Sequence, residues 1–245
     1  MPPAPASTLS ILAAGLAVLA AISTGSATAA SGASGAGFVQ PTASLAILLG
    51  PQAARSAPDA HARVVQRVSA LRPITAERTV LPVIGRRTGP GGARWLHVLL
   101  PGRPNGHAGW IRRSGTRAAL TSWHLVIDTS SRRVTAYQNG RPVRVFRAVV
   151  GTPGTPTPQG RFFVEEAVAL RAGDVGAPFA LALSARSTVL QEFAGGPGQI
   201  ALHGLMNVGG TLGTAASHGC VRLGNDVMRW LVIRVGPGVP VTITG

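Results

Sequence analysis

Short apolar runs that alternate with glycine- and proline-rich turns recur along most of this chain, and this pattern constrains its fold more than any other feature. "WHLVID" (123–128) and "RVTAYQ" (133–138) alternate apolar and polar residues as half-buried strands do. Asn139-Gly140 is the pair that favours a type I′ hairpin turn, and residues 141–151 supply the returning strand. The 32 glycines and 19 prolines also favour strands and turns over long helices. We therefore predict a mainly β fold.

Two blocks of such runs follow one another. Between residues 45 and 120 the spacing of strands and turns is typical of a small β-barrel. The "WLHVLLPGRPNGHAGWI" stretch in this block resembles the bacterial Src-homology-type β-barrel modules that often precede cell-wall enzymes. The strands predicted here cover residues 63–68, 79–85, 94–100 and 109–113.

The second block, residues 121–245, is also predicted to be rich in strands. One short helix is expected over residues 226–235, capped by Asn225 and stopped by Gly236-Pro237-Gly238. Residues 112–122, which join the two blocks, have the composition of a short flexible connection. Besides the hairpin, the predicted strands cover residues 161–170, 198–204 and 239–245.

The beginning of the chain has the composition of an export signal. Its apolar stretch, Leu9 to Ile22, is too short to prefer spanning a bilayer, and Ala27-Thr28-Ala29 fits the A-x-A cleavage pattern. We expect residues 1–29 to be this signal and residues 30–44 to be a linker without fixed structure. The remainder is then exported to the cell envelope, or anchored to the membrane if the signal is not removed.

The chain is strongly basic, with a net charge of +15 carried by arginine alone. Aromatic residues make up only 4% of the chain, and no basic run is interleaved with them, so we expect no nucleic-acid partner. A positive surface also suits an anionic polymer such as a bacterial cell wall. Arg86, Arg87, Arg112 and Arg113 of the first block are candidates for that contact, and a solvated basic face is an equal alternative. We expect a monomer.

Cys220 is the only cysteine, and it lies in the run "SHGCVRLGN". Outside the cytoplasm cysteines usually pair, so a lone one indicates a reactive thiol or an intermolecular bridge. A thiol becomes a nucleophile when a base or a positive charge helps to ionise it. His203 ends a candidate strand 17 residues earlier, and the glycine-rich segment between them is able to bring the two together.

The neighbours of Cys220 suit an acyl-transfer site. Gly219 lets the backbone approach a substrate, and the amides of Gly219 and Cys220 are able to face a developing oxyanion. Arg222 offers a cation for a substrate carboxylate. His218 is a poor base for Cys220 if the segment is extended, because side chains two residues apart are roughly 7 Å apart along a strand.

These residues carry a resemblance. "HGLMNVGGTLGTAASHGCVRL" (203–223) is similar to the signature of the bacterial L,D-transpeptidases of the YkuD type, in which a histidine precedes Ser/Thr-His-Gly-Cys. The resemblance covers about residues 121–245. It implies that Cys220 is the nucleophile and that His203 is the general base and later the acid, oriented by the backbone carbonyl of Gly204.

The resemblance also implies roles for the flanking residues and a reaction. His218 and Gly219 are expected to shape the site and its oxyanion hole, Ser217 to support it, and Arg222 to contact substrate. The expected partners are two peptidoglycan stem peptides, a donor and an acceptor. Cys220 would attack the bond between diaminopimelate and D-alanine in the donor, and an amine of the acceptor would resolve the thioester. No cofactor is expected, because each step is acyl transfer.

Several alternatives remain open at this stage. An L,D-carboxypeptidase would use the same residues with water as acceptor, and a peptidoglycan-binding protein would need no catalysis. A zinc site at His203, His218 and Cys220 matches no common structural zinc spacing, so we expect no metal. A papain-like peptidase is disfavoured because its cysteine precedes its histidine. The other four histidines, His61, His97, His107 and His124, lie in candidate strands or turns without partners, and we expect them at ordinary surface or core positions. Asp128, Glu165 and Glu166 are expected to be solvated charges of strands and loops.

Overall fold

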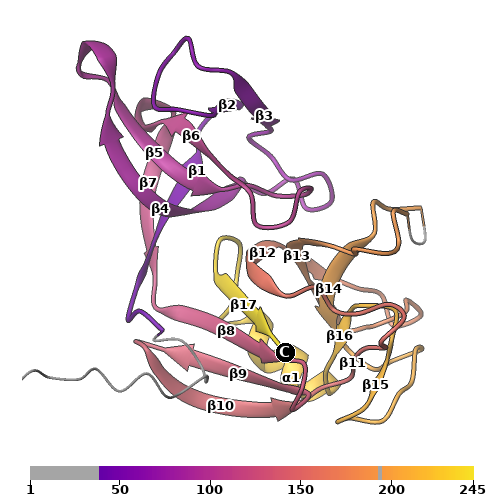
Figure 1. Cartoon of the computed structure of the whole chain (residues 1–245). Helices are drawn as coiled ribbons and strands as arrows, with labels where there is room; N and C mark the ends of the chain where they lie inside the picture. The colour runs from indigo at the N-terminus through magenta and orange to yellow at the C-terminus, as the bar shows by residue number, and fades with distance from the viewer. Residues whose placement is uncertain (1–38, 193–194) are drawn as a thin grey trace, which may run out of the picture. The chain divides into compact units, whose positions relative to one another are not determined.

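The computed structural model describes residues 39–192 and 195–245, and these residues form a mainly β structure (Figure 1). The predicted fold class is therefore confirmed. The predicted export signal, residues 1–29, lies outside the described residues, as does most of the predicted linker. No helix within the described residues is long and apolar enough to cross a membrane.

The first sheet contains seven antiparallel strands in the order β3-β2-β6-β5-β4-β1-β7. Its core holds Leu48, Leu81, Val98, Leu100 and Ile111, all of them fully or almost fully buried. The strands are β1 (Ala43–Leu48), β2 (Gln52–Arg55), β3 (Val64–Val68), β4 (Val80–Thr88), β5 (Arg94–Leu99), β6 (Ala108–Arg112) and β7 (Thr116–Thr121), with short 3-10 turns η1 (Pro90–Gly92) and η2 (Arg113–Gly115).

Two predictions about the ends of this block are wrong. The linker expected over residues 30–44 extends too far, because β1 already begins at Ala43 and the side chain of Val39 is buried. The flexible connection expected over residues 112–122 is mostly β7, which pairs with β1 along six residues. The backbone partners of β7 lie some 70 residues earlier in the chain, so no local composition signal indicates this strand.

The second sheet contains eight strands in the order β10-β9-β8-β17-β12-β13-β14-β16, with a small two-stranded sheet of β11 and β15. The predicted hairpin is confirmed, with φ of 51° at Asn139 and 74° at Gly140, as a type I′ turn requires. The strands are β8 (Trp123–Asp128), β9 (Arg133–Gln138), β10 (Arg141–Arg147), β11 (Val150–Gly151), β12 (Gly160–Ala169), β13 (Phe179–Arg186), β14 (Gln199–His203), β15 (Ala215–Ser217), β16 (Val221–Arg222) and β17 (Pro240–Thr244).

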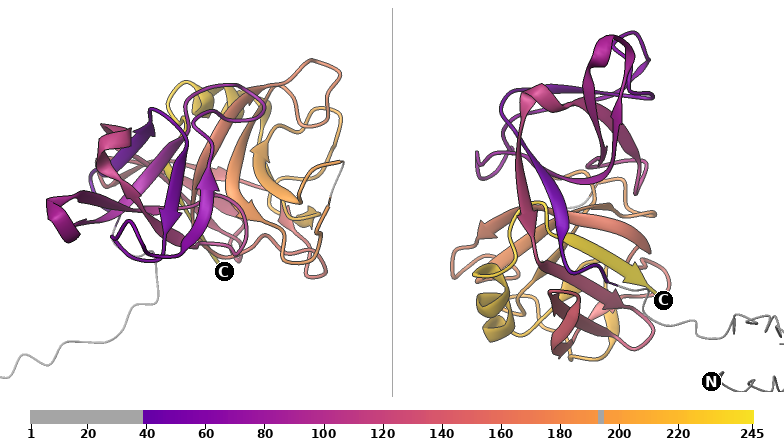
Figure 2. Two further views of the ribbon diagram at one scale, coloured as in Figure 1. Left: turned by 90° about the horizontal axis from the view of Figure 1, so that it is seen from above. Right: turned by 90° about the vertical axis from the view of Figure 1, so that its left-hand side faces the viewer.

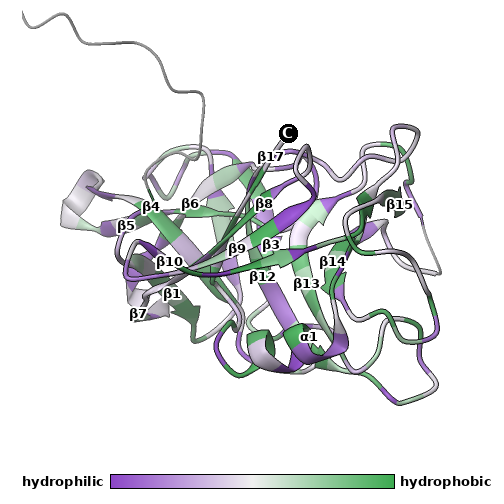
Figure 3. Cartoon of the chain, turned by 90° about the horizontal axis from the view of Figure 1, so that it is seen from below, coloured by the Kyte–Doolittle hydropathy of each residue, from purple (hydrophilic) through white to green (hydrophobic). Residues whose placement is uncertain are grey.

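The one α-helix of the described residues, α1 (Asn225–Val232), is short and follows β16 (Figure 2). It carries hydrophobic and hydrophilic residues on different sides (Figure 3), and Met228 and Leu231 are fully buried in the core of the second sheet. Burying such a side chain stabilises the fold by about 1.5–3 kcal/mol. The helix cap was predicted wrongly, because Gly224 is the N-cap and the side chain of Asn225 bonds elsewhere.

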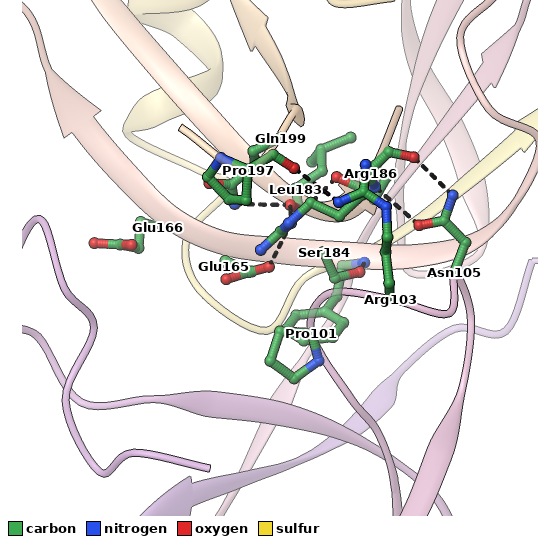
Figure 4. Close-up of polar contacts among 12 residues, drawn as sticks. Pro101, Arg103, Asn105, Glu165, Glu166, Leu183, Ser184, Arg186, Pro197 and Gln199 are labelled. Carbon is green, nitrogen blue, oxygen red and sulfur yellow. Dashed lines mark hydrogen bonds and ion pairs between the residues drawn. The ribbon is translucent and has the colours of Figure 1, made fainter. Parts of the chain in front are cut away.

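Strand β13, which lies between β12 and β14, was not predicted, and it changes the environment of two carboxylates. Glu165 and Glu166 on β12 are each only 1% exposed, so their prediction as surface charges is wrong. Glu165 forms ion pairs with Arg72 and with Arg186, whose Nη1 lies 3.0 Å from its Oε1 (Figure 4). Glu166 accepts hydrogen bonds from the backbone amides of Ile74 and Thr75 and from the hydroxyl of Thr75.

Three histidines that were expected to lack partners have them. The ring of His97 stacks on Trp110 with centroids 4.6 Å apart. His107 Nε2 lies 2.7 Å from Gln66 Oε1. His124 Nε2 lies 2.9 Å from the hydroxyl of Thr242, which links β8 to β17.

Candidate active site

The parallel pairing of β14 with β16 brings the two predicted catalytic residues to one face of the second sheet. His203, the last residue of β14, is paired with Arg222 on β16. Cys220 directly precedes β16 and lies two residues before Arg222. His203, Cys220 and Arg222 therefore meet at one cavity, although His203 is distant from the other two in the sequence.

A cavity of about 320 Å³ lies at this face. Cys220, His203, His218 and Arg222 all line it. The rest of its wall is largely apolar, with Val175, Leu190, Ile200 and Val208 among the lining side chains. A concave apolar site with a few convergent polar groups is the usual form of a substrate pocket.

His203 is held in one orientation by its own backbone neighbour. Its Nδ1 lies 2.8 Å from the carbonyl oxygen of Gly204. A carbonyl only accepts hydrogen bonds, so Nδ1 carries the proton and Nε2 of the neutral ring is left as the acceptor. Burial lowers the pKa of His203 below its ordinary 6.5, and the nearby charge of Arg222 lowers it further, although the bond to Gly204 opposes them. The ring is therefore a neutral base at pH 7.

Two glycines fit closely around this histidine. A Cβ on Gly176, whose φ is 87°, would lie 2.5 Å from His203 Nδ1. A Cβ on Gly204 would lie 2.0 Å from the carbonyl oxygen of Ala177 and 2.6 Å from Asn225 Oδ1. The amide of Gly204 donates to the carbonyl of Gly176 at 2.7 Å. The ring can therefore occupy this position only because Gly176 lacks a side chain, and the absence of a side chain at Gly204 lets the next segment pack against Ala177 and Asn225.

Asn225, predicted only as a helix cap, also supports the histidine. Its Oδ1 accepts a hydrogen bond from the amide of Leu205 at 2.9 Å. Leu205 follows Gly204 directly, so the first residue of α1 holds the segment that carries the acceptor of His203. The amide of Leu223 donates to the carbonyl of His203 at 2.9 Å and ties the same segment to the strand after Cys220.

The thiol of Cys220 is part-buried beside β14. Its Sγ lies 4.0 Å from the carbonyl oxygen of Gln199. Burial raises the pKa of Cys220 above the ordinary 9.0, while a backbone hydrogen bond from Ala201 and the positive charge of Arg222 act in the opposite direction. Burial is the largest of these effects, so the resting thiol is neutral and needs a base to become a nucleophile.

The turn before Cys220 is closed by Ser217, which is 1% exposed. The Ser217 hydroxyl donates to the carbonyl of Cys220 at 2.6 Å and accepts from the amide of Gly219 at 3.1 Å. Gly219 has a φ of 117°, and a Cβ there would lie 3.0 Å from the Ile200 side chain. This conformation strongly favours glycine.

Three threonines of the loop after β11 hold the same turn from the other side. Thr157 donates its hydroxyl to the carbonyl of Gly219 at 2.8 Å. Thr155 donates its hydroxyl to the carbonyl of Ser217 at 3.2 Å, and the amide of Thr152 donates to that carbonyl at 3.0 Å. Residues 152–160 read as a turn-rich loop in the sequence, and nothing in that pattern indicates these bonds.

Arg222 and His218 complete the polar wall. Nη1 of Arg222 donates to the carbonyl of Gly209 at 3.3 Å, and its Nε is buried without a hydrogen-bond partner among the described residues. A guanidinium with unused donors beside a thiol is suited to hold an anionic substrate group. His218 is exposed on the rim of the cavity. Within residues 39–192 and 195–245 no cluster of three or more His, Cys, Asp or Glu residues is able to hold a metal ion.

Residues 122–243 match the model of the L,D-transpeptidase catalytic domain, YkuD. No match was found among curated proteins.

Solved structures of L,D-transpeptidases are also similar to this chain. One from Mycobacterium smegmatis is 17% identical over 67% of this chain and 99% of its own, with a TM-score of 0.39. One from Mycobacterium tuberculosis is 17% identical over 68% of this chain and 90% of its own, with a TM-score of 0.43. One from Enterococcus faecium is 24% identical over 49% of each chain, with a TM-score of 0.36.

Proposed function

Because residues 122–243 belong to the L,D-transpeptidase catalytic domain family, we propose that this protein is an exported peptidoglycan L,D-transpeptidase that cross-links stem peptides through an acyl-enzyme on Cys220. The observation that carries the proposal is one shared cavity. It holds a lone thiol and an imidazole whose tautomer leaves Nε2 as the acceptor.

The first half-reaction forms the thioester. His203 Nε2 takes the proton of Cys220, and the sulfur attacks the carbonyl carbon of diaminopimelate at its bond to the terminal D-alanine. When the tetrahedral intermediate collapses, the C–N bond breaks and the protonated His203 gives its proton to the departing amine. D-alanine leaves, and the donor stem remains as an acyl-thioester on Cys220.

The second half-reaction transfers the acyl group. The side-chain amine of an acceptor stem attacks the thioester carbonyl, and His203 takes a proton from that amine. The C–S bond breaks, the sulfur recovers its proton from His203, and an amide bond now joins two diaminopimelate residues. Both half-reactions are acyl transfers, so these residues complete the cycle without a cofactor.

Neighbouring groups take defined parts in this proposal. The Gly219 amide already donates to Ser217 Oγ, so we assign Gly219 and Ser217 to the shape of the turn, and the Cys220 amide to the oxyanion. Arg222 is proposed to bind a carboxylate of the donor stem. His218 shapes the rim of the cavity. The protein acts as a monomer in the cell envelope, after export by the signal proposed for residues 1–29.

The experiment that tests this function is an intact-mass measurement. The protein is incubated with a carbapenem, a reactive acyl donor, and weighed. We expect one covalent adduct per chain on the wild type and none on Cys220→Ala. An adduct that survives Cys220→Ala, or no adduct on the wild type, would favour a non-catalytic binding protein.

A second measurement identifies the acceptor. Tetrapeptide stems are incubated with the enzyme, with and without an added amine acceptor, and the products are separated by mass. A cross-linked dimer supports the transpeptidase. Release of D-alanine with only free tripeptide, whatever amine is added, identifies an L,D-carboxypeptidase that uses the same acyl-enzyme.

A further inference from the structure

We propose that Arg103, in the turn between β5 and β6, is a positioning residue that holds one wall of the Cys220 cavity in place. The inference rests on the proposed function for its effect on turnover. The inference that Arg103 fixes the backbone of the β13–β14 connection does not depend on the proposed function.

The guanidinium of Arg103 joins three carbonyls from the two ends of the β13–β14 connection. Nη2 donates to the carbonyls of Ser187 at 2.8 Å and Leu190 at 3.1 Å, and Nη1 donates to the carbonyl of Pro197 at 2.9 Å. Ser187 and Leu190 both line the Cys220 cavity. A single side chain from the first sheet therefore binds the backbone of residues that form the wall of the site.

Asn105, two residues after Arg103, makes a second attachment next to the first. Its Nδ2 donates to the carbonyl of Arg186 at 2.8 Å, and its Oδ1 accepts from the amide of Arg186 at 2.8 Å (Figure 4). The amide of Gly102 donates to the carbonyl of Ser184 at 3.2 Å. The β5–β6 turn is therefore hydrogen-bonded to Ser184 and Arg186 at the end of β13. The next residue, Ser187, is the first one after β13 that lines the cavity.

The two ends of the β13–β14 connection, which carry the cavity-lining residues Ser187, Leu190 and Gly198, are hydrogen-bonded to each other next to Arg103. The amide of Ser187 donates to the carbonyl of Gly198 at 2.7 Å, and the Ser187 hydroxyl accepts from the amide of Leu190 at 2.9 Å. Gly198 has a φ of 62°, and a Cβ there would lie 2.1 Å from the Leu190 carbonyl oxygen and 3.3 Å from Arg103 Nη2. Several carbonyls converge on one point, and a planar guanidinium with five donors is the side chain that can satisfy them together.

The chemical groups of the site do not contact Arg103, so its loss should act on substrate binding more than on the thiol. Arg103 is an exposed residue overall, and water competes for its donors. A moderate effect is therefore expected. Arg103→Ala should raise the KM for the donor stem about five- to tenfold and change kcat less than about twofold.

The experiment compares wild type with Arg103→Ala, Arg103→Lys and a matched control, Arg117→Ala. Arg117 is an exposed arginine on β7 of the first sheet whose side chain makes no hydrogen bond or ion pair within the described residues. Arg103→Lys keeps the charge but not the planar fork, so its KM should fall between wild type and Arg103→Ala. Arg117→Ala should match wild type. Melting temperatures show whether each variant is folded.

Hydrogen exchange supplies a readout that does not depend on the function. The amides of Ser187, Leu190 and Gly198 should exchange faster in Arg103→Ala than in wild type and Arg117→Ala, while those of β8 and β9 stay unchanged. Unchanged exchange at these three amides, or faster exchange with an unaltered KM, would overturn the inference. If wild type neither reacts with the carbapenem nor turns over stems, the proposed function fails, and exchange alone then decides whether Arg103 holds this wall.

Discussion

The hydroxyl of Ser217 lies 2.6 Å from the carbonyl oxygen of Cys220 and, at the same time, 3.1 Å from the amide of Gly219. One buried side chain thus bridges both ends of the turn that presents the thiol. Each partner is left without this bond when the hydroxyl is removed, and a buried polar group left unpaired is costly.

Ser217→Ala should therefore lower the free energy of unfolding by about 1–3 kcal/mol and slow the formation of the carbapenem adduct. Urea unfolding and time-resolved intact mass measure the two effects. Ser217→Thr keeps the hydroxyl and should retain most of the adduct rate. Equal losses in both variants would show that the size of the side chain, not its hydroxyl, supports the turn.

The reactivity of Cys220 should keep rising with pH through the neutral range. Burial raises the pKa of its thiol above the ordinary 9.0 and lowers the pKa of His203 below 6.5, so the resting pair is neutral. Alkylation by iodoacetamide reports the thiolate, and its rate should increase about tenfold per pH unit below the thiol pKa and still be increasing at pH 9.0. A plateau below pH 8 would instead indicate a preformed thiolate–imidazolium pair.

Gly176→Ala should displace His203. The new Cβ would lie 2.5 Å from Nδ1, and the φ of 87° is a conformation that alanine rarely adopts. We expect the rate of thioester formation to fall about 100-fold, as small displacements of catalytic groups do. Gly173→Ala is the matched control, because a Cβ there meets nothing within 4 Å and the glycine is exposed. Similar losses in both variants would contradict the prediction.

His124 should make the fold less stable in mild acid. Burial lowers its pKa from 6.5 to about 4, so the folded protein binds this proton less readily than the unfolded chain. Stability contributed by the neutral ring is complete above pH 6.5 and is lost as the pH falls from 6.5 to about 4. Urea midpoints measured across this range should fall less in His124→Gln than in wild type. His61→Gln, at an exposed position, should behave as wild type.

Glu165→Gln should destabilise the protein more than any surface change. The carboxylate lies between Arg72 and Arg186, and burial lowers the pKa of both arginines because it disfavours their charged forms. Removing the negative charge leaves two buried cations with reduced compensation, and we expect a loss of about 3 kcal/mol in the free energy of unfolding. Glu77→Gln, at an exposed residue, is the control, and an equal effect there would refute the argument.

Local patterns in the sequence were sufficient for the elements whose partners lie nearby. β8 and β9 begin and end where the alternation predicted, because the hairpin turn at Asn139-Gly140 sets their register. The candidates Cys220 and His203 were likewise recognisable, since a lone thiol beside His-Gly with a histidine upstream is a local signal. From the sequence, it could only be expected that these two residues face one cavity, and the structure shows that both line it.

Tertiary structure decided what depends on distant partners. β13 was missed, and with it the burial of Glu165, because that carboxylate is enclosed by Arg186 of β13 and by Arg72, which lies more than 90 residues earlier in the chain. Gly176 and Arg103 gained their places near the site in the same way. The sequence by itself indicated the strands that alternate clearly and the candidate residues for the chemistry, because both signals are local. Which strands became neighbours, and so which groups share a cavity, was decided by long-range pairing that no local pattern encodes.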